Sequence, residues 1–166
     1  MSVLTQEIEV MQNPALGSVL LWRFAQAYAS AHPQKDGPPL PLAFLVLPLL
    51  WHTGTAETVA STRTGSGLRL FAGKFMDPIG SARDVLFAVQ DRAIRWREKS
   101  AAGLRMAYAT GLLELAESGR LKVCSTTPEP NQNRVVAAMV DGAEKLGVWF
   151  ASLSLDEICL VLHVRF

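Results

Sequence analysis

The sequence predicts a mainly α-helical (α+β) fold: a compact helical domain with one β-hairpin. Of the 166 residues, 49% are apolar and 19% are charged, a composition typical of a chain with a single globular core. Apolar residues recur at helical spacing in several segments, whereas only one pair of short segments alternates around a glycine turn. We therefore expect one domain over residues 1–166, with residues 1–12 as a flexible arm.

The first helix is predicted from Pro14 to about Ala31. Asn13 is a suitable N-cap, and proline is favoured at the first helical position. Apolar side chains then follow a helical stripe through Leu16, Leu20, Phe24, Ala27 and Tyr28. The segment HPQKDGP, residues 32–38, has the residues of a loop.

The stretch GPPLPLAFLVLPLLWH, residues 37–52, has no charged side chain between Pro38 and Trp51. It is shorter than the roughly 20 residues of a spanning helix and contains several prolines, so we expect no membrane span. Alternation is absent, which favours a buried helix that starts at Pro41 and bends at Pro48. A buried strand is the alternative. We expect His52 at the end of this helix, with its ring near free carbonyls.

Two short helices are predicted next, on either side of Gly65-Ser66-Gly67. The first covers Thr53–Thr64, and the second carries a stripe of Leu68, Phe71 and Phe75. Two short helices around a glycine turn are a weak indication of a helix-turn-helix, because many small helical domains contain such corners.

A longer helix is predicted from a Ser81 cap to Lys99, and another from Ser100 or Ala101. We expect the apolar face of the longer helix to contain these residues: Val85, Leu86, Val89, Ile94 and Trp96. Leu113–Leu115 and Leu121–Val123 then alternate around Glu117-Ser118-Gly119, which predicts a β-hairpin. The order helix, helix, hairpin makes the segment around residues 81–125 winged-helix-like.

The remaining segment predicts two helices after a polar loop at residues 128–133. Residues 135–152 are amphipathic, and Ser154 can cap a short helix over Leu155–Leu162.

No arrangement of residues indicates an enzyme, a cofactor site or a metal site. The histidines His32, His52 and His163 lack metal-ligand spacing, and Gly65-Ser66-Gly67 follows no strand that would present a nucleophile. Cys124 and Cys159 have no CxxC partner, which favours reduced thiols in a cytoplasmic protein. The first residues do not resemble a signal peptide. We therefore expect no catalytic residue, cofactor or metal.

One helix face collects positive charge in an otherwise neutral chain of 16 Lys plus Arg and 15 Asp plus Glu. The spacing of Arg92, Arg95 and Lys99 places them on one face, and Arg105 can join them from the next helix. Four cations on one surface can contact nucleic-acid phosphates. The alternative is a solvated face with ion pairs to Asp91 and Glu98.

Four segments resemble one bacterial family when taken in order: NPALGSVLLWRFAQAY, PLPLAFLVLPLLWH, ASTRTGSGLRLFAGKF and GAEKLGVWFASLSLDEI. Together they run from Asn13 to Ile158. They resemble the middle component of three-component ABC-ATPase systems. The resemblance implies a non-enzymatic adaptor subunit between an ABC ATPase and a larger protein with an effector domain. It also implies a role in anti-phage defence.

The resemblance is strongest between Ser61 and Phe75, and we expect a protein-binding surface there. Its residues are Ser61, Thr62, Arg63, Ser66, Leu68, Phe71, Lys74 and Phe75. The expected partners are the ATPase subunit and the larger third component. DNA would be contacted only through the assembled complex, and we expect no membrane and no small-molecule substrate.

Two other functions stay open on the sequence alone. A free-standing winged-helix DNA-binding regulator would bind DNA by itself, and the near-zero net charge argues against it. A small enzyme would need a pocket with perturbed titratable groups.

Overall fold

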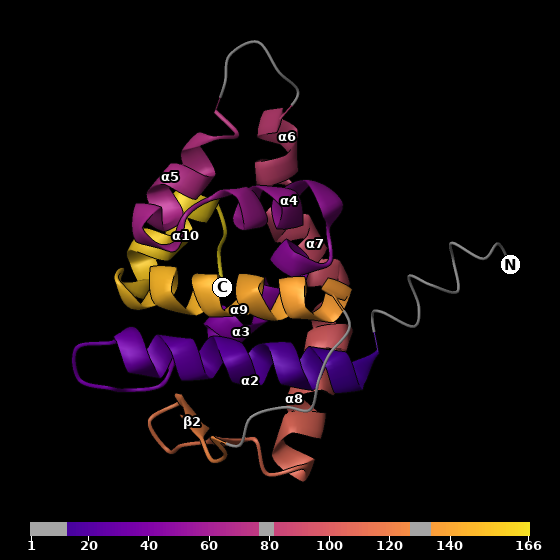
Figure 1. Ribbon diagram of the computed structural model, residues 1–166, viewed down its shortest axis with the longest axis vertical. Helices are drawn as coiled ribbons and strands as arrows, with labels where there is room; N and C mark the ends of the chain where they lie inside the picture. The colour runs from indigo at the N-terminus through magenta and orange to yellow at the C-terminus, as the bar shows by residue number, and fades with distance from the viewer. Residues whose placement is uncertain (1–12, 77–81, 127–133) are drawn as a thin grey trace, which may run out of the picture.

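The computed structural model describes residues 13–76, 82–126 and 134–166. Figure 1 shows α2 (Pro14–Ala31) and α9 (Arg134–Ala151) side by side, in front of α3 (Leu40–Leu50). Beside them α6 (Ala82–Phe87), α7 (Val89–Arg95) and α8 (Arg97–Ala109) follow one another in a column. At the upper end lie the short helices α4 (Thr53–Ser61), the 3₁₀ turn η1 (Thr64–Ser66), α5 (Gly67–Gly73) and α10 (Leu155–Leu162). The hairpin of β1 (Leu113–Leu115) and β2 (Leu121–Val123) lies at the lower end. The predicted mainly α fold with one hairpin is confirmed.

Helix α2 has the predicted bounds and cap. The Asn13 side chain accepts a hydrogen bond from the Leu16 N–H at 2.7 Å. Its inner face is buried against α8 and α9. The crossing with α9 is close because Gly147 has no side chain: a Cβ there would lie 2.5 Å from the Phe24 carbonyl oxygen.

The apolar stretch forms a helix, which decides between the two alternatives left by the sequence. Helix α3 begins at Leu40 and contains Pro48, and most of its residues are buried. Its last carbonyls find donors outside the helix. The Pro48 oxygen accepts from Arg92 Nε at 3.3 Å, and the Leu49 oxygen accepts from the Thr55 hydroxyl at 2.6 Å.

The expected role of His52 at the end of α3 is wrong, because this residue is the N-cap of α4. Its Nδ1 accepts a hydrogen bond from the Thr55 N–H at 3.4 Å. Helix α4 departs from α3 at 98°, so the ring of His52 faces the first turn of α4. Burial lowers the pKa of His52, and the positive charge of Arg92 lowers it further.

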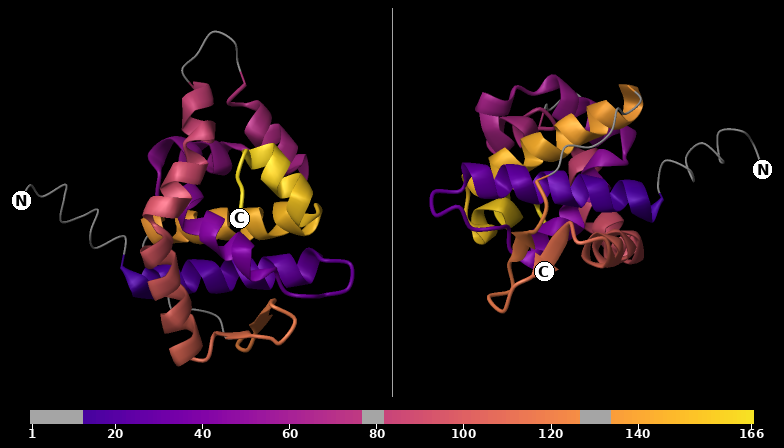
Figure 2. Two further views of the ribbon diagram at one scale, coloured as in Figure 1. Left: turned by 180° about the vertical axis from the view of Figure 1, so that it is seen from behind. Right: turned by 60° about the horizontal axis from the view of Figure 1, so that its bottom comes forward.

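The predicted division of residues 81–101 is also corrected. Ser81 lies outside the described residues. The helix is interrupted at Ala88 and Trp96 rather than at Ser100. Helical hydrogen bonds cross both breaks, which keeps α6–α8 in one column (Figure 2): Arg92 N–H donates to Ala88 and Ser100 N–H donates to Trp96. A new helix at Ser100 or Ala101 is therefore wrong.

The predicted apolar face of this column is wrong at Ile94, which is 60% exposed. The residues that face the core are spaced by four, three and four at Val89, Ala93, Trp96 and Ser100. Ile94 follows one of them and turns outward, whereas Arg92 is buried against the end of α3.

The hairpin has the predicted strands, with Leu113 opposite Val123 and Leu115 opposite Leu121. Gly119 forms the turn with a φ of 76°. The hairpin is tied to the segment before α3: Leu40 N–H donates to the Gly119 oxygen, and Leu121 N–H donates to the Pro38 oxygen. The order of helix and hairpin is as predicted, and the winged-helix likeness of this segment stays a prediction.

The last two helices match their predicted bounds closely. Helix α9 begins at Arg134 and buries Leu146, Trp149 and Phe150. Helix α10 begins with a capping box, in which Ser154 and Glu157 each bind the other's backbone N–H. None of the helices in the described part of the chain is by itself long and apolar enough to cross a membrane. Helices α3 and α4 taken together are long and apolar enough, but the pair is bent by 98°.

Candidate protein-interaction site

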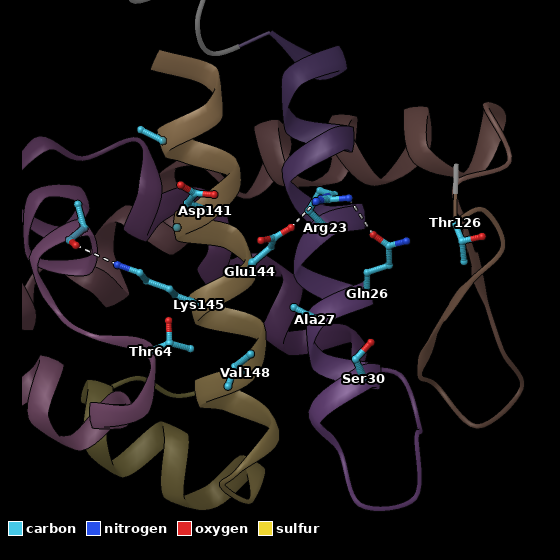
Figure 3. A pocket seen from close by; sticks show the side chains of 13 residues that line it. Arg23, Gln26, Ala27, Ser30, Thr64, Thr126, Asp141, Glu144, Lys145 and Val148 are labelled. Carbon is cyan, nitrogen blue, oxygen red and sulfur yellow. Dashed lines mark hydrogen bonds and ion pairs between the residues drawn. The ribbon is translucent and has the colours of Figure 1, made fainter. Parts of the chain in front are cut away.

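A groove of about 630 Å³ runs between α2 and α9, and the end of α4 with η1 closes one side of it (Figure 3). The lining side chains are mainly small or polar: Arg23, Gln26, Ala27, Ser30, Ala60, Thr64, Thr126, Ala138, Asp141, Glu144, Lys145 and Val148. Arg23 of α2 forms an ion pair with Glu144 of α9 through its Nη2. Its Nη1 donates to the Gln26 side-chain oxygen at 3.4 Å. A charged bridge therefore joins the two helices beside the groove.

Lys145 fastens α9 to the carboxyl end of α4. Its Nζ donates to the carbonyl oxygens of Val59, Ala60 and Thr62 at 3.2, 2.9 and 3.1 Å. These oxygens lie at the negative end of the α4 dipole, where a cation is stabilising. The contact fixes the wall of the groove that α4 and η1 form.

The segment expected to bind proteins is only partly at the surface. Thr62, Leu68, Phe71 and Phe75 are each 4% exposed or less. This corrects the expectation that all eight residues form one surface. The buried four hold the segment on the core, where the Phe71 ring centroid lies 5.7 Å from that of Trp149.

The other four residues of the segment reach solvent to different degrees. Ser61, Arg63 and Lys74 are exposed, and Ser66 is half-buried. Lys74 Nζ donates to the Ser61 carbonyl at 3.2 Å, next to the carbonyls that Lys145 binds. The Trp149 indole donates to the Thr64 carbonyl at 2.8 Å, which holds η1 at the groove. Of this segment, Thr64 lines the α2–α9 groove, and Ser61 and Arg63 are sequence neighbours of the lining residues Ala60 and Thr64.

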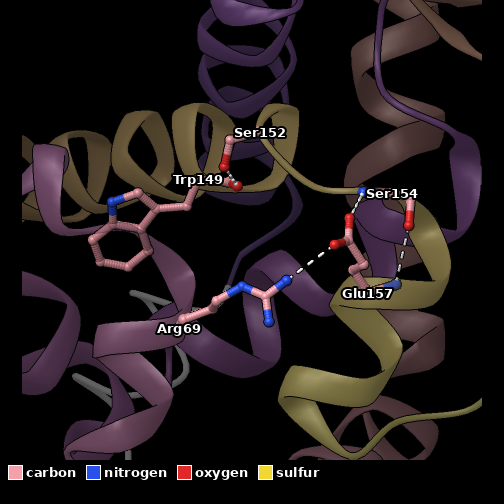
Figure 4. Close-up of polar contacts among 5 residues, drawn as sticks. All are labelled: Arg69, Trp149, Ser152, Ser154 and Glu157. Carbon is pink, nitrogen blue, oxygen red and sulfur yellow. Dashed lines mark hydrogen bonds and ion pairs between the residues drawn. The ribbon is translucent and has the colours of Figure 1, made fainter.

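Helix α5 is fixed to α10 by exposed polar contacts (Figure 4). Arg69 lies 3.0 Å from one Glu157 oxygen, and the other oxygen accepts the Ser154 N–H at 2.8 Å. The Ser154 N–H is the main reason why the pKa of Glu157 is lowered, and Arg69 lowers it further. Because the Arg69–Glu157 pair is open to solvent, we expect it to orient α5 more than to stabilise it.

One of the four residues of the expected basic surface is not at the surface. Arg92 is 6% exposed and donates to Pro48 and Val85 carbonyls at 3.3 and 3.1 Å. Burial lowers its pKa, and Arg95 lowers it further. Arg95, Lys99 and Arg105 are exposed, and Lys99 lies 5.4 Å from the centre of the Trp96 ring. Arg92 therefore caps α3, and three cations remain at the surface.

Within residues 13–76, 82–126 and 134–166, no group of three or more His, Cys, Asp or Glu side chains could hold a metal ion. Both cysteines are free thiols. Cys124 is exposed, and burial raises the pKa of the partly buried Cys159.

The comparisons with known proteins identify the family. The whole chain, residues 1–166, matches the family described as the ABC-three component (ABC-3C) system Middle Component 3. The chain belongs to the Middle Component 3 family. A search of curated proteins and a search of solved structures each found no match.

Sequence reasoning missed the groove of this Middle Component 3 chain. Its signal is a small group of charged residues on two mainly apolar helices, Arg23 on α2 and Asp141, Glu144 and Lys145 on α9. These residues are far apart in the sequence, so the pattern becomes clear only when α2 and α9 are placed side by side.

Proposed function

We propose that this chain is a non-enzymatic adaptor subunit that links the ABC ATPase of a three-component system to its larger, effector-bearing component. The observation that carries the proposal is the match of the whole chain to a family of middle components. A middle component must contact other proteins of its system, and a small helical domain offers exposed helix faces for this purpose.

The α2–α9 groove is the first surface that we assign to this role. Exposed polar groups line it, and the accessible residues of the Ser61–Phe75 segment border it. Arg23 and Lys145 fix its walls through contacts between helices, so the groove exists before a partner binds.

Co-expression of the chain with the other two components of its system tests the proposal. We expect a tag on the ATPase to retain both this chain and the third component. The double variant Arg63→Glu and Asp141→Lys, at the groove and its border, should lower the amount of this chain that the tagged ATPase retains at least tenfold. Arg83→Glu with Asp84→Lys, at two exposed positions of α6, is the matched control, since it too reverses two charges without changing the net charge. A monomer that never co-elutes with either component would refute the adaptor function.

The wider setting of the adaptor follows from the same proposal. We propose that the complex acts in the bacterial cytoplasm as part of anti-phage defence. A strain that carries the intact system should resist phages that a strain with this one gene deleted does not resist. Equal plaque numbers on both strains, across a broad phage panel, would contradict the defence role and leave the adaptor role intact.

A contact between the complex and nucleic acid is a second proposal, and it rests on the exposed cations of α7 and α8. Arg95→Glu, Lys99→Glu and Arg105→Glu together should lower the affinity of the complex for DNA and flatten its salt dependence. The control reverses Arg83, Lys122 and Arg134, which changes the net charge equally elsewhere. Equal affinities for the two triple variants would remove α7–α8 as a DNA contact.

A further inference from the structure

A second groove, apolar and of about 410 Å³, lies between the start of α3, helix α7 and the last residues of the chain. Its lining residues include Leu40, Pro41, Phe44 and Ile94. It is lined by none of the residues of the α2–α9 groove. Seen from behind (Figure 2, left), the column of α6–α8 and the last residues of the chain lie in front of α9. In Figure 1, by contrast, α2 and α9 are in front. The two grooves therefore face different sides of the molecule.

One wall of this apolar groove is held by a reciprocal contact. The Gln90 side chain on α7 accepts the Arg165 N–H at 2.8 Å and donates to the Arg165 carbonyl at 3.3 Å. A little further along, the rings of Phe87 and His163 meet edge to face at 4.9 Å. These contacts hold residues 163–166 along α7, so both walls are formed in the absence of a partner.

The groove and its surroundings expose several large apolar side chains. Ile94 is 60% exposed, Phe166 59%, Phe87 44% and Leu160 75%. Leu160 and Arg165 also line a neighbouring hollow on α10, which makes the surface continuous from α3 to α10. An apolar surface of this kind is typical of a protein-binding site.

The charges of the groove determine which partner fits it. Arg97 and Arg165 line it, and neither guanidinium has a hydrogen-bond or ion-pair partner among the residues that the structure describes. Among the described residues, no Asp or Glu side chain lines the groove itself, and Asp156 lines the neighbouring hollow on α10. Two copies of this chain that met face to face would bring four guanidinium groups together, which disfavours a symmetric dimer. The apolar walls likewise do not suit a nucleic-acid strand.

We propose that this groove binds a segment of one other component of the system, with apolar side chains in the groove and carboxylates beside Arg97 and Arg165. The proposal rests on the adaptor function, and it adds the second surface that an adaptor between two proteins needs. The apolar side chains of the segment would cover Ile94 and Phe44. Its carboxylates would pair with the two free guanidinium groups, which favours an acidic partner over a neutral one.

A photo-reactive amino acid at Ile94 tests the proposal in the assembled complex. Ile94 is a suitable position because its side chain is exposed, so the fold should tolerate the replacement. We expect a cross-link to one other component, in a peptide with apolar residues and nearby Asp or Glu. A cross-link to a second copy of this chain, a peptide without carboxylates, or no cross-link would overturn the proposal.

Charge variants give an independent readout. Arg97→Glu with Arg165→Glu should weaken binding of the cross-linked component at least tenfold, and Asp/Glu→Lys changes in its peptide should restore it. Ile94→Ser should weaken the same contact, with Val135→Ser, an exposed apolar residue on α9, as its control. Loss of neither component would overturn this inference, whereas a chain that joins no complex at all would refute the adaptor function itself.

Discussion

At the scale of single residues, the Lys145 side chain binds several backbone groups at once. Its Nζ binds three carbonyls at the end of α4. Methionine keeps the length and much of the apolar stem but cannot donate. Because hydrogen bonds to charged groups contribute about 1.5–3 kcal/mol, we expect Lys145→Met to lower the free energy of unfolding by about that amount in urea denaturation.

Lys122→Met is the matched control for this prediction. Lys122 is 66% exposed and lies 3.6 Å from Glu114 across the hairpin. Such surface pairs contribute roughly 0–1 kcal/mol, so the control should change stability little. Equal losses for the two variants would contradict the assigned role of Lys145.

His52 gives a prediction about pH. Its Nδ1 must be unprotonated to accept the Thr55 N–H, and burial and Arg92 lower its pKa below the ordinary 6.5. As pH falls below about 6.5, the unfolded chain binds a proton that the folded chain resists, so stability falls. His52→Asn keeps a capping oxygen and does not titrate. Urea midpoints at pH 7.5 and 5.5 should therefore differ more for the natural chain than for this variant.

At the scale of elements, the crossing of α2 and α9 depends on Gly147. A Cβ on this residue would meet the Phe24 oxygen at 2.5 Å and the Tyr28 nitrogen at 2.8 Å. Both are backbone atoms, so the helices must move apart. We expect Gly147→Ala to cost about 1–3 kcal/mol of stability. At Gly73 a Cβ would meet nothing within 4 Å, and Gly73→Ala should be neutral or stabilising. If Gly147→Ala left the free energy of unfolding unchanged, the backbones of α2 and α9 could not lie as close together as 2.5 Å from this Cβ position requires.

The elements also show what the sequence could and could not predict. Caps and turns are local, so Asn13, Ser154 and Gly119 mark their elements correctly. The burial pattern of the column α6–α8 is harder to predict, because residue type alone places the apolar Ile94 in the core and the charged Arg92 in solvent. Arg92 is buried because the end of α3 offers carbonyls to its guanidinium, and a single sequence does not show which helix end lies nearby.

The candidate site was predictable only in part for the same reason. The segment Ser61–Phe75 contributes Thr64 to the wall of a groove, but its aromatic residues pack inward, and its role in protein binding stays a prediction. A phenylalanine in a short helix looks the same in sequence whether it faces a partner or the core. The α2–α9 groove needs two helices more than 100 residues apart to lie side by side, as Arg23 and Glu144 do.

At the scale of the whole molecule, the proposed adaptor has two preformed grooves of different chemistry. The α2–α9 groove is lined by several charged and polar side chains and held by the Arg23–Glu144 pair, whereas the α3–α7 groove is almost wholly apolar and has two free arginines. Different chemistry on different sides allows two unlike partners to bind without competing. Helix α3 lies between the surfaces and is buried, so it provides a rigid support for both.

That support leads to the last prediction, which concerns the single domain proposed for residues 1–166. The buried apolar residues of α2, α3, α8 and α9 form one continuous cluster, so no element in the described chain has a core of its own. Unfolding should then be one cooperative event. Tryptophan fluorescence reports on Trp22 and Trp149 in the core, and far-UV circular dichroism reports on all helices. We expect both signals to give the same urea midpoint.

Gly103→Val, at the crossing of α8 with α2, should lower the two midpoints equally because a Cβ there already meets Gly17 at 3.1 Å. Two separate transitions, with only one shifted by this variant, would show that the chain folds as two units.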